Sequence, residues 1–489
     1  MCNNFRSIYF LLFIVFLPVY LYSQPNTMFY LRALPQSVEI NPSFHNDSAK
    51  FWIGVPLLSG IQAEVNTGGV TWNDAIMEDP ENYDSLLVDL NGFVDALQKN
   101  NFLFEETSIA LISFGFRQRD NNFFFSVNER QVAKGTYNKT FAEFLRDGNV
   151  PYQGETLDFN NPWGEFVHFR EYAFGASRKI NQKLTLGATA KILYGKSVVN
   201  MKFSDLTLYT SDISEGNKVR ITSEALLRFS APFRVTLNEE GLVSSVTEDF
   251  PSVKDYLFNT ENSGFSIGAG ATYQAKPGVT LSASVMDLGF INWKSDVQQL
   301  EQKGEYAFEG LNLKPFIDDG ELAESEIIDA YTELVDSIAD NFRIIEGGNT
   351  FTTSLPAKIY LGARFYSSDN LHWGILSRTR IYGGKLEENL TLSGNMKVTD
   401  FLSVSGSWSI SKGKYNNLGL GILTETGNLQ IYAASDNVPA FFYPTINPYF
   451  DFRFGMNLIF REKKKKIKAW APSTCKSLSR SPQQRMKKR

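Results

Sequence analysis

Histidine and cysteine have the widest chemical range of the protein side chains, and both are scarce in this chain of 489 residues. His45, His168 and His372 lie far apart, and none has a neighbour at the spacing of a metal site or a catalytic pair. Cys2 and Cys475 lie near the two ends, so the chain between them offers no cysteine for a disulfide or a zinc site. No phosphate-binding loop, nucleophile elbow or zinc-protease motif is present. The sequence therefore predicts no enzyme, no metal site and no cofactor.

Charged residues within alternating apolar segments are better candidates for a functional site. Lys191 lies between two apolar neighbours, and Asp451 and Arg453 alternate with phenylalanines. In a strand, successive side chains point to opposite faces, so these three charges lie on the face opposite their apolar neighbours. We expect Lys191, Asp451 and Arg453 to line the inside of a strand wall. Lys191 and Arg453 could hold an anionic head group, or either could neutralise an interior acid such as Asp451.

The segment 450–460 shows which element would position such residues. Its apolar face consists of Phe450, Phe452, Phe454, Met456, Leu458 and Phe460, and mostly polar or small residues lie between them. A strand that crosses a membrane in a barrel needs ~9–11 residues, apolar toward lipid and polar toward the lumen. This segment therefore has the length and the pattern of a transmembrane strand.

The same alternation recurs in the segments 184–194, 265–274 and 402–411, and in the last of these every second residue is serine. A secreted β-sandwich or propeller is the alternative, but strands in soluble proteins average only ~5–6 residues. The mean hydropathy of −0.21 and the lack of long apolar runs beyond the N-terminus exclude a helical membrane bundle. The fold class predicted is an all-β membrane protein, an antiparallel transmembrane β-barrel.

Turn signals divide the barrel into about fourteen strands, with both of its ends on the periplasmic side. Short connections alternate with longer external ones, as in bacterial outer-membrane barrels. The expected strands are 50–71, 106–119, 122–133, 166–179, 182–203, 263–275, 277–293, 355–367, 369–382, 385–398, 400–411, 416–425, 427–435 and 448–460. The segment 197–262 could hold an additional hairpin, 198–210 with 218–231, on the external rim.

The two ends of the chain differ from the predicted barrel, 50–460. Residues 1–23 combine an early positive charge, a short apolar stretch and a small final residue, which predicts a signal peptide. Residues 24–49 contain Pro35 and Pro42 and show no strand pattern, so this irregular segment either plugs the barrel mouth or leads into the first strand. Residues 461–489 carry 12 Lys or Arg and one Glu, which predicts a basic, disordered periplasmic tail.

Two external connections, 72–105 and 294–354, show helical spacing. Apolar residues fall on one helical stripe in each, beginning at Leu86 and at Ile327. The first carries eight acids and one lysine, and the second carries fourteen acids and four bases. These helices either cover apolar rim surface or act as lids over an apolar pathway. The lid candidates are Leu90, Phe93, Tyr331 and Leu334.

Two motifs carry a resemblance to a known family. The first is the run from Leu31 to Ser37 (LRALPQS) with the run from Asn41 to Phe44 (NPSF), and the second runs from Ser284 to Trp293 (SVMDLGFINW). With these motifs the chain resembles an uncharacterised outer-membrane β-barrel family related to FadL-like transporters and PorV-type barrels, over most of 28–460. The resemblance implies a fourteen-stranded barrel with an N-terminal hatch in its lumen.

Two functions remain open at this point. The FadL-like resemblance implies passive passage or binding of a hydrophobic small molecule, whereas the PorV-like resemblance implies a scaffold or partner of a secretion or surface-assembly complex. The expected location is the cell outer membrane, and the expected partners are its lipid and either a hydrophobic small molecule or a secretion-complex protein. The basic run from Lys463 to Lys466 would face the periplasm, so nucleic acid is not an expected partner.

Overall fold

The computed structural model describes residues 26–31, 33–44, 49–79, 85–159, 162–212, 218–238, 243–248, 251–308, 317–318, 321–322, 344–346, 348, 350–411 and 414–461. The predicted signal peptide, the basic tail beyond Arg461 and much of the connection 294–354 lie outside these residues. Within the described ranges, no helix has both the length and the apolar character needed to cross a membrane.

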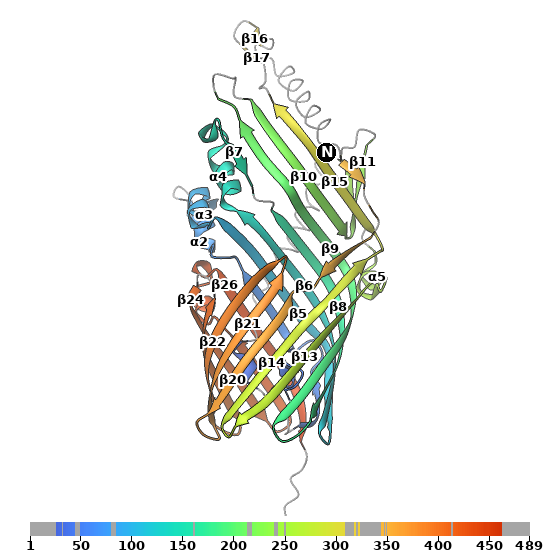
Figure 1. Cartoon of the computed structure of the whole chain (residues 1–489), viewed down its shortest axis with the longest axis vertical. Coiled ribbons are helices and arrows are strands. Elements are labelled where there is room, and N and C mark those ends of the chain that lie inside the picture. Colours follow the sequence, from blue (N-terminus) through green and yellow to red (C-terminus); the bar gives the residue numbers. More distant parts are fainter. Residues whose placement is uncertain are drawn as a thin grey trace, which may run out of the picture.

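Fourteen strands of the described chain form a closed antiparallel wall, as predicted (Figure 1). The last strand, β26, pairs with β25 on one side and with β1 and β2 on the other, which closes the barrel. In wall order the strands are β1 (Ala49–Gly54) with β2 (Ile61–Asn66), β5 (Asn100–Gln118), β6 (Asn121–Asn138), β8 (Trp163–Lys179), β9 (Leu184–Thr210), β13 (Asn262–Lys276), β14 (Val279–Trp293), β19 (Phe351–Ser354) with β20 (Ala357–Tyr366), β21 (Leu371–Tyr382), β22 (Lys385–Lys397), β23 (Leu402–Ser411), β24 (Lys414–Thr426), β25 (Leu429–Ser435) and β26 (Tyr449–Arg461).

Two wall positions are each formed by two short strands. Only the first was predicted as one strand, 50–71, whereas β19 lies within the predicted connection 294–354. The first strand is interrupted between β1 and β2, where Pro56 lacks a backbone donor and Leu57 adopts a positive φ of 65°. The wall stays hydrogen-bonded there, because the Val55 amide donates to Met456 O at 3.0 Å and the Leu57 amide donates to Ala110 O at 3.1 Å. The other interruption, between β19 and β20, also contains a proline. Continuous pairing over 50–71 was therefore a wrong prediction.

Strand β9 is 27 residues long and extends well beyond the rim (Figure 1). Its first half pairs with β13 and its second half with β10 (Val219–Ser230), which confirms the hairpin predicted for 198–210 and 218–231. β10 pairs in turn with β15 (Val297–Phe308), and β15 pairs briefly with β18 (Ile344–Glu346). The connection 294–354 therefore begins as a strand, where the sequence indicated no strand.

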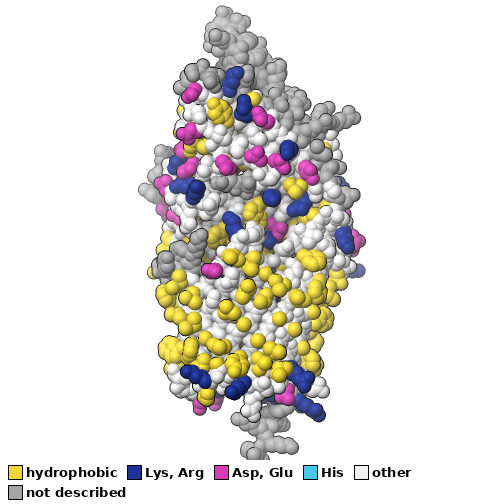
Figure 2. Space-filling model, in the orientation of Figure 1, with side chains coloured by type: hydrophobic (Ala, Val, Ile, Leu, Met, Phe, Trp, Pro, Cys, Tyr) yellow, Lys and Arg dark blue, Asp and Glu magenta, His cyan; other side chains and the backbone are white. Residues whose placement is uncertain are grey.

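Side chains alternate across the wall as the sequence predicted. On β23, Ser405 and Ser409 are 0% and 1% exposed and face the lumen, whereas Trp408 is 40% exposed on the outer surface. Apolar side chains cover the lower part of the visible face of the barrel (Figure 2). A closed wall satisfies every strand's backbone groups, which is the condition for strands to span lipid. The molecule is an outer-membrane type of β-barrel.

Short helices and strands lie at the external end of the barrel. These are α2 (Trp72–Ala75), β3 (Ile76–Glu78), β4 (Leu86–Val88), α3 (Leu90–Ala96), α4 (Lys139–Asp147), η3 (Val150–Tyr152), β7 (Thr156–Asp158), β11 (Phe233–Leu237), β12 (Val243–Glu248), α5 (Val253–Phe258), β16 (Ile317–Asp318), β17 (Glu321–Leu322), α7 (Pro439–Phe442) and η6 (Pro444–Ile446). The predicted helical stripe beginning at Leu86 is wrong for its first turn, which is strand β4. The side chain of Asp89 accepts a hydrogen bond from the Gly92 amide, so the helix begins only at Leu90.

Candidate functional site in the lumen

Residues 26–31 and 33–44, here called the plug segment, lie inside the barrel. They fold as two short 3-10 helices, η1 (Met28–Tyr30) and η2 (Pro35–Glu39), and Pro35 suits the start of η2 because its φ is already fixed. The apolar side chains of the plug segment pack on inward-facing residues of the wall. That cluster comprises Met28, Phe29, Tyr30, Leu31, Leu34, Ile40 and Phe44 with Met286, Tyr360, Leu376, Leu423 and Tyr432. The plug segment therefore has the packing of a soluble protein core.

Hydrogen bonds tie the plug segment to many strands. The Thr27 amide donates to the Asp436 carboxylate at 2.8 Å, and the Tyr30 hydroxyl donates to Ile375 O at 2.5 Å. On another side of the barrel, Gln36 Nε2 donates to Asn457 Oδ1 at 2.6 Å. These contacts fix the plug segment at several points around the wall.

Inward-facing glycines make room for the plug segment. A Cβ on Gly374 would lie 2.3 Å from the ring of Tyr30, and one on Gly270 would lie 2.0 Å from Asn41 Oδ1. Real Cβ atoms do not approach other atoms so closely, so a larger residue at either position would displace the plug segment. This signal was present in the sequence as glycines within alternating strands, although they also suit strand pairing alone.

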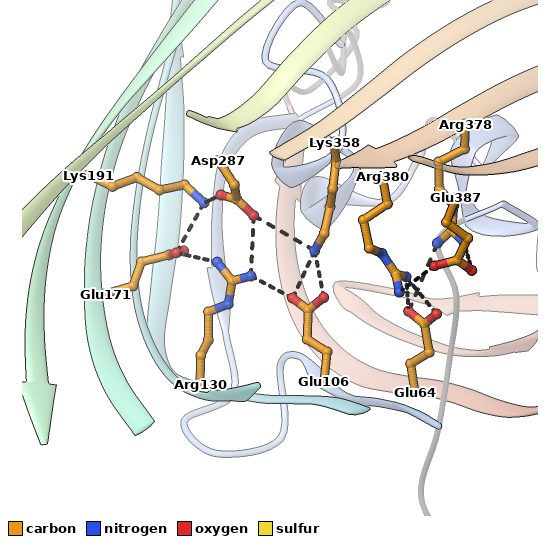
Figure 3. A network of polar contacts seen from close by, with 10 residues as sticks. All are labelled: Glu64, Glu106, Arg130, Glu171, Lys191, Asp287, Lys358, Arg378, Arg380 and Glu387. Atoms are coloured by element: carbon orange, nitrogen blue, oxygen red, sulfur yellow. Dashed lines mark hydrogen bonds and ion pairs between the residues drawn. The ribbon is translucent and has the colours of Figure 1, made fainter. Parts of the chain in front are cut away.

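Above the plug segment, charged side chains cross the lumen as a layer (Figure 3). Arg130 lies at its centre and pairs with Glu106 at 2.5 Å, Glu171 at 2.7 Å and Asp287 at 3.2 Å. Lys191 Nζ lies 3.1 Å from the Glu171 carboxylate and 2.7 Å from the Asp287 carboxylate. These residues come from five different strands, so the network joins distant parts of the wall.

The layer continues toward β2, β21 and β22. Lys358 Nζ lies 2.8 Å from Glu106, and Arg380 pairs with Glu64 at 2.5 Å and with Glu387 at 3.2 Å. Arg378 is 1% exposed and lies 3.9 Å from the Glu64 carboxylate. We call these ten residues the charge layer: Glu64, Glu106, Arg130, Glu171, Lys191, Asp287, Lys358, Arg378, Arg380 and Glu387. Its five bases and five acids balance, which makes burial of so many charges tolerable.

The second family motif shapes the charge layer through Asp287. This residue has a positive φ of 60°, a conformation that Asp tolerates better than most residues. The pairing of β14 with β13 breaks there: Val285 pairs with Ala269, but Leu288 pairs with Ile267, so β14 holds one extra residue. The break turns the Asp287 carboxylate toward Arg130, Lys191 and Lys358. The motif therefore encodes a bend in the wall that positions an interior acid.

On the external side of the charge layer, apolar side chains fill the lumen. We call this group the external apolar cluster: Phe104, Val132, Val167, Phe169, Leu193, Val198, Ile291, Trp293, Phe351, Leu355 and Tyr382. Two arginines of the charge layer lie over its rings, Arg380 at 3.7 Å from the centre of Phe104 and Arg130 at 5.3 Å from that of Phe169. Cation–π contacts of this kind are favourable when water is excluded. The two layers are therefore in direct contact.

The described interior is densely packed from the plug segment to the external apolar cluster. Its interior voids, beside Glu39 and Arg453 and beside Arg130 and Lys358, have volumes of about 10 and 40 Å³. Pockets for small ligands are typically ~300–1,000 Å³. A wider recess of about 610 Å³ opens only at the periplasmic end and is lined by polar residues such as Thr185. Any cargo that crosses must therefore displace part of the plug segment and of the charge layer.

The three predicted lumen residues all face inward, but they do not form one site. Lys191 neutralises interior acids in the charge layer, as one of the two interpretations expected. Asp451 is 0% exposed and accepts hydrogen bonds from the Asp436 and Asn437 amides at 2.8 and 2.9 Å. Arg453 lies beside the plug segment, with Nη1 at 3.9 Å from the sulfur of Met28.

The remaining charge-layer residues were missed by sequence reasoning. Arg378 and Arg380 lie two residues apart on one strand face, and this spacing was the available signal for inward charges. Within the plug segment, Glu39 is also buried. Burial and the nearby Glu171 carboxylate raise the pKa of Glu39.

The lid candidates are only partly described. Leu90 is 43% exposed, and Phe93 is partly buried against a cluster that includes Val94 and Leu97. Tyr331 and Leu334 lie outside the described residues. Their role as lids stays a prediction.

Two of the three histidines are described, and they lie on different strands. On the outer wall, His168 Nε2 lies 3.0 Å from Glu129, and Nδ1 lies 2.7 Å from the Tyr256 hydroxyl of α5. His372 lies on β21 beside the ring of Tyr366. Among the described residues, no group of three or more His, Cys, Asp or Glu is placed to hold a metal ion.

The fold and the lumen together define a closed outer-membrane barrel whose interior holds an N-terminal plug and a balanced layer of charge. Comparison with family models places the chain more narrowly. The chain belongs to the Family of unknown function (DUF5723), whose model matches residues 42–436. No curated protein matches the sequence.

Several solved structures of FadL-like transporters are similar over most of the chain. A FadL homologue of Pseudomonas aeruginosa is 12% identical with a TM-score of 0.36, covering 86% of this chain and 91% of that one. The toluene transporter TbuX of Ralstonia pickettii is 10% identical with a TM-score of 0.39, covering 87% and 94%. The toluene transporter TodX of P. putida is 10% identical with a TM-score of 0.34, covering 88% and 94%. None of these three supports the secretion-complex alternative.

Proposed function

We propose that this protein is a gated outer-membrane barrel that binds a hydrophobic small molecule and passes it inward. The observation that carries this proposal is the external apolar cluster. A water-filled barrel has a polar interior, whereas here aromatic and aliphatic side chains such as Phe104, Phe169 and Trp293 face the lumen. An apolar lining with few polar groups is the chemistry of a site for hydrophobic ligands.

Passage would take place in three steps set by the order of the layers. A hydrophobic molecule first separates the side chains of the external apolar cluster and takes their place. The charge layer below must then open, and the plug segment must shift last. TodX and TbuX are toluene transporters by name, but the proposal for this chain rests on its own inward-facing side chains. Under the same proposal Leu90, Phe93, Tyr331 and Leu334 would act as lids at the entrance.

Trp293 offers the sharpest test. It is 0% exposed, its ring stacks on Phe351 at 6.3 Å, and its indole N–H donates to Thr353 Oγ1 at 3.0 Å. Trp293→Gln would place an unpaired amide among apolar groups, which should weaken binding of a hydrophobic ligand on the order of tenfold. The measurement is the uptake rate of the fluorophore 1-N-phenylnaphthylamine by cells that express each variant.

Trp373→Gln is the matched control. The indole of Trp373 also donates to a hydroxyl, Ser367 Oγ at 3.2 Å, but this residue is 54% exposed on the lipid-facing side. Uptake should fall in Trp293→Gln and stay at the wild-type rate in Trp373→Gln. Wild-type uptake no faster than that of cells lacking the protein would refute the proposed function.

A further inference from the structure

The periplasmic rim of the barrel is charged very unevenly. Its first half, formed by the ends and turns of β1, β5, β6, β8, β9, β13 and β14, carries five exposed bases and one exposed acid, Asp120. We call the bases the basic arc: Lys50, Arg119, Arg178, Lys183 and Lys276. Because these strands are consecutive neighbours in the wall, the bases follow one another along the same side of the rim.

The other half, from β20 to β26, has no such excess. Its two exposed bases are already neutralised by neighbouring acids: Lys397 Nζ lies 2.6 Å from Asp400, and Arg461 lies 2.8 Å from Glu425. Asp369 adds a further exposed acid. Bases that served only to keep the rim soluble would not need to be confined to one half.

The bases of the arc have no protein partners of this kind. Within the described residues, Arg119, Arg178 and Lys183 take part in no ion pair, although Asp120 lies close to them in the sequence. A group of unpaired like charges repels itself unless an opposite charge is nearby. The basic arc is therefore expected to attract anions.

The height of the basic arc indicates which anions can reach it. The outward-facing strand residues next to these bases are large and apolar: Phe116 and Tyr273 are 43% and 44% exposed. The bases therefore lie where the apolar band ends, and Lys and Arg side chains are visible directly below that band at the lower rim (Figure 2). Phospholipid head groups of the inner leaflet occupy this level.

We propose that the basic arc binds anionic phospholipid head groups, such as phosphatidylglycerol or cardiolipin, in the inner leaflet of the outer membrane. Each Lys or Arg near an anionic membrane surface contributes about fivefold in affinity. The apolar residues above the arc would contact the acyl chains of the same lipids. A soluble acidic protein would have to contact bases that follow one another along half of the rim, close to the edge of the apolar band.

The sequence adds an independent observation. The chain leaves the barrel at Arg461, which pairs with Ala49 beside Lys50, the first base of the arc. The residues beyond it are rich in lysine and arginine. The most basic part of the sequence thus begins at the border of the most basic part of the rim.

Lipid selectivity of the full-length protein tests this proposal. The protein would be placed in nanodiscs with equal amounts of phosphatidylglycerol and phosphatidylcholine, and native mass spectrometry would count the lipids of each kind that stay bound. We expect the wild type to retain mainly phosphatidylglycerol. In Arg178→Gln/Lys183→Gln this preference should fall tenfold or more.

The matched control is Lys397→Gln/Arg461→Gln, which also removes one lysine and one arginine but on the other half of the rim. It should keep the wild-type preference, and the heat-modifiable migration of all variants would verify that their barrels are folded. Equal loss in both double variants, or no preference in the wild type, would overturn the proposal. It would also be overturned if the arc variant lost binding to isolated peptidoglycan while it kept its lipid preference, since the partner would then be the cell-wall polymer.

Discussion

The outer wall and the lumen of this barrel are built from the same strands but obey different rules. On the outer wall, large apolar residues such as Leu392, Leu420 and Phe460 are 40–43% exposed to the lipid side and need no specific neighbour. In the lumen, Arg130 and Arg380 are 4% and 0% exposed, and each depends on partners from other strands. One face tolerates exchange among apolar residues, whereas the other requires particular pairs.

This difference between the two faces determines which single substitutions destabilise the barrel. A substitution on the outer wall changes only contacts with lipid. Its effect on stability therefore depends on the polarity of the new side chain and on its depth in the membrane. A substitution in the charge layer leaves the ion-pair partners of the replaced residue without a counter-charge. An uncompensated buried charge destabilises the folded state strongly. The two faces should therefore respond to opposite changes: adding a charge outside and removing one inside.

The largest effect is expected from Arg130→Met. This change would leave Glu106, Glu171 and Asp287 without their central cation, and breaking a buried pair typically costs ~3–5 kcal/mol. Arg220→Met is the control, because the Arg220–Glu305 pair is 57% exposed at both residues and should contribute ~0–1 kcal/mol. Urea unfolding of the two variants in lipid vesicles measures the difference, and equal losses would contradict a special role for the charge layer.

The next largest effect concerns the outer wall. Leu420 lies near the middle of β24 and is 40% exposed toward lipid, so Leu420→Arg should cost ~2–4 kcal/mol. Thr185→Arg is the inward comparison, since Thr185 lines the open periplasmic recess and leaves room for a longer side chain. Ser405, on strand β23 next to β24, would be unsuitable for this comparison, because its side chain is fully buried against Asn395 and Thr27. Refolding into lipid should separate the two arginine variants, and similar losses would contradict the assignment of faces.

A smaller effect follows from Asp436, which lies outside the strands and holds the start of the plug segment. Burial raises the pKa of Asp436 from 3.8 to about 6. A carboxyl group with a raised pKa stabilises the folded state fully at low pH and loses that contribution as pH rises through about 6. Hydrogen exchange at the Thr27 amide, corrected for intrinsic rates, should therefore be slower at pH 5 than at pH 7. Asp436→Asn should remove this pH dependence, and an unchanged profile in that variant would assign it to another group.

The smallest effect is expected from removal of the residues beyond Arg461. Truncation after Arg461 should leave insertion unchanged, because β26 is complete at that residue. Deletion of 449–460 should abolish insertion, since it removes the partner of both β25 and β1. Outer-membrane fractionation measures both results. If the protein truncated after Arg461 failed to insert, the tail would have a role in assembly.

Sequence alone predicted the wall much better than the lumen. Alternation states which residues face inward, and it placed Lys191, Asp451 and Arg453 there. It does not state which inward residues meet, because the partners of Arg130 come from positions 106, 171 and 287 and depend on strand register. The bend at Asp287 was not predicted either, since an Asp in an alternating strand fits an ordinary inward charge as well as a positive φ.

The contacts of the plug segment have a consequence for the order of assembly. Thr27 and Gln36 bond to residues 409 and 421 positions later in the chain. Contacts of such long sequence separation form slowly, because a long loop must close before they are made. During export from the N-terminus, the plug segment emerges first, yet its partners on β26 and beside β25 emerge last. The bonds of Thr27 to Asp436 and of Gln36 to Asn457 can therefore form only when the barrel is almost complete.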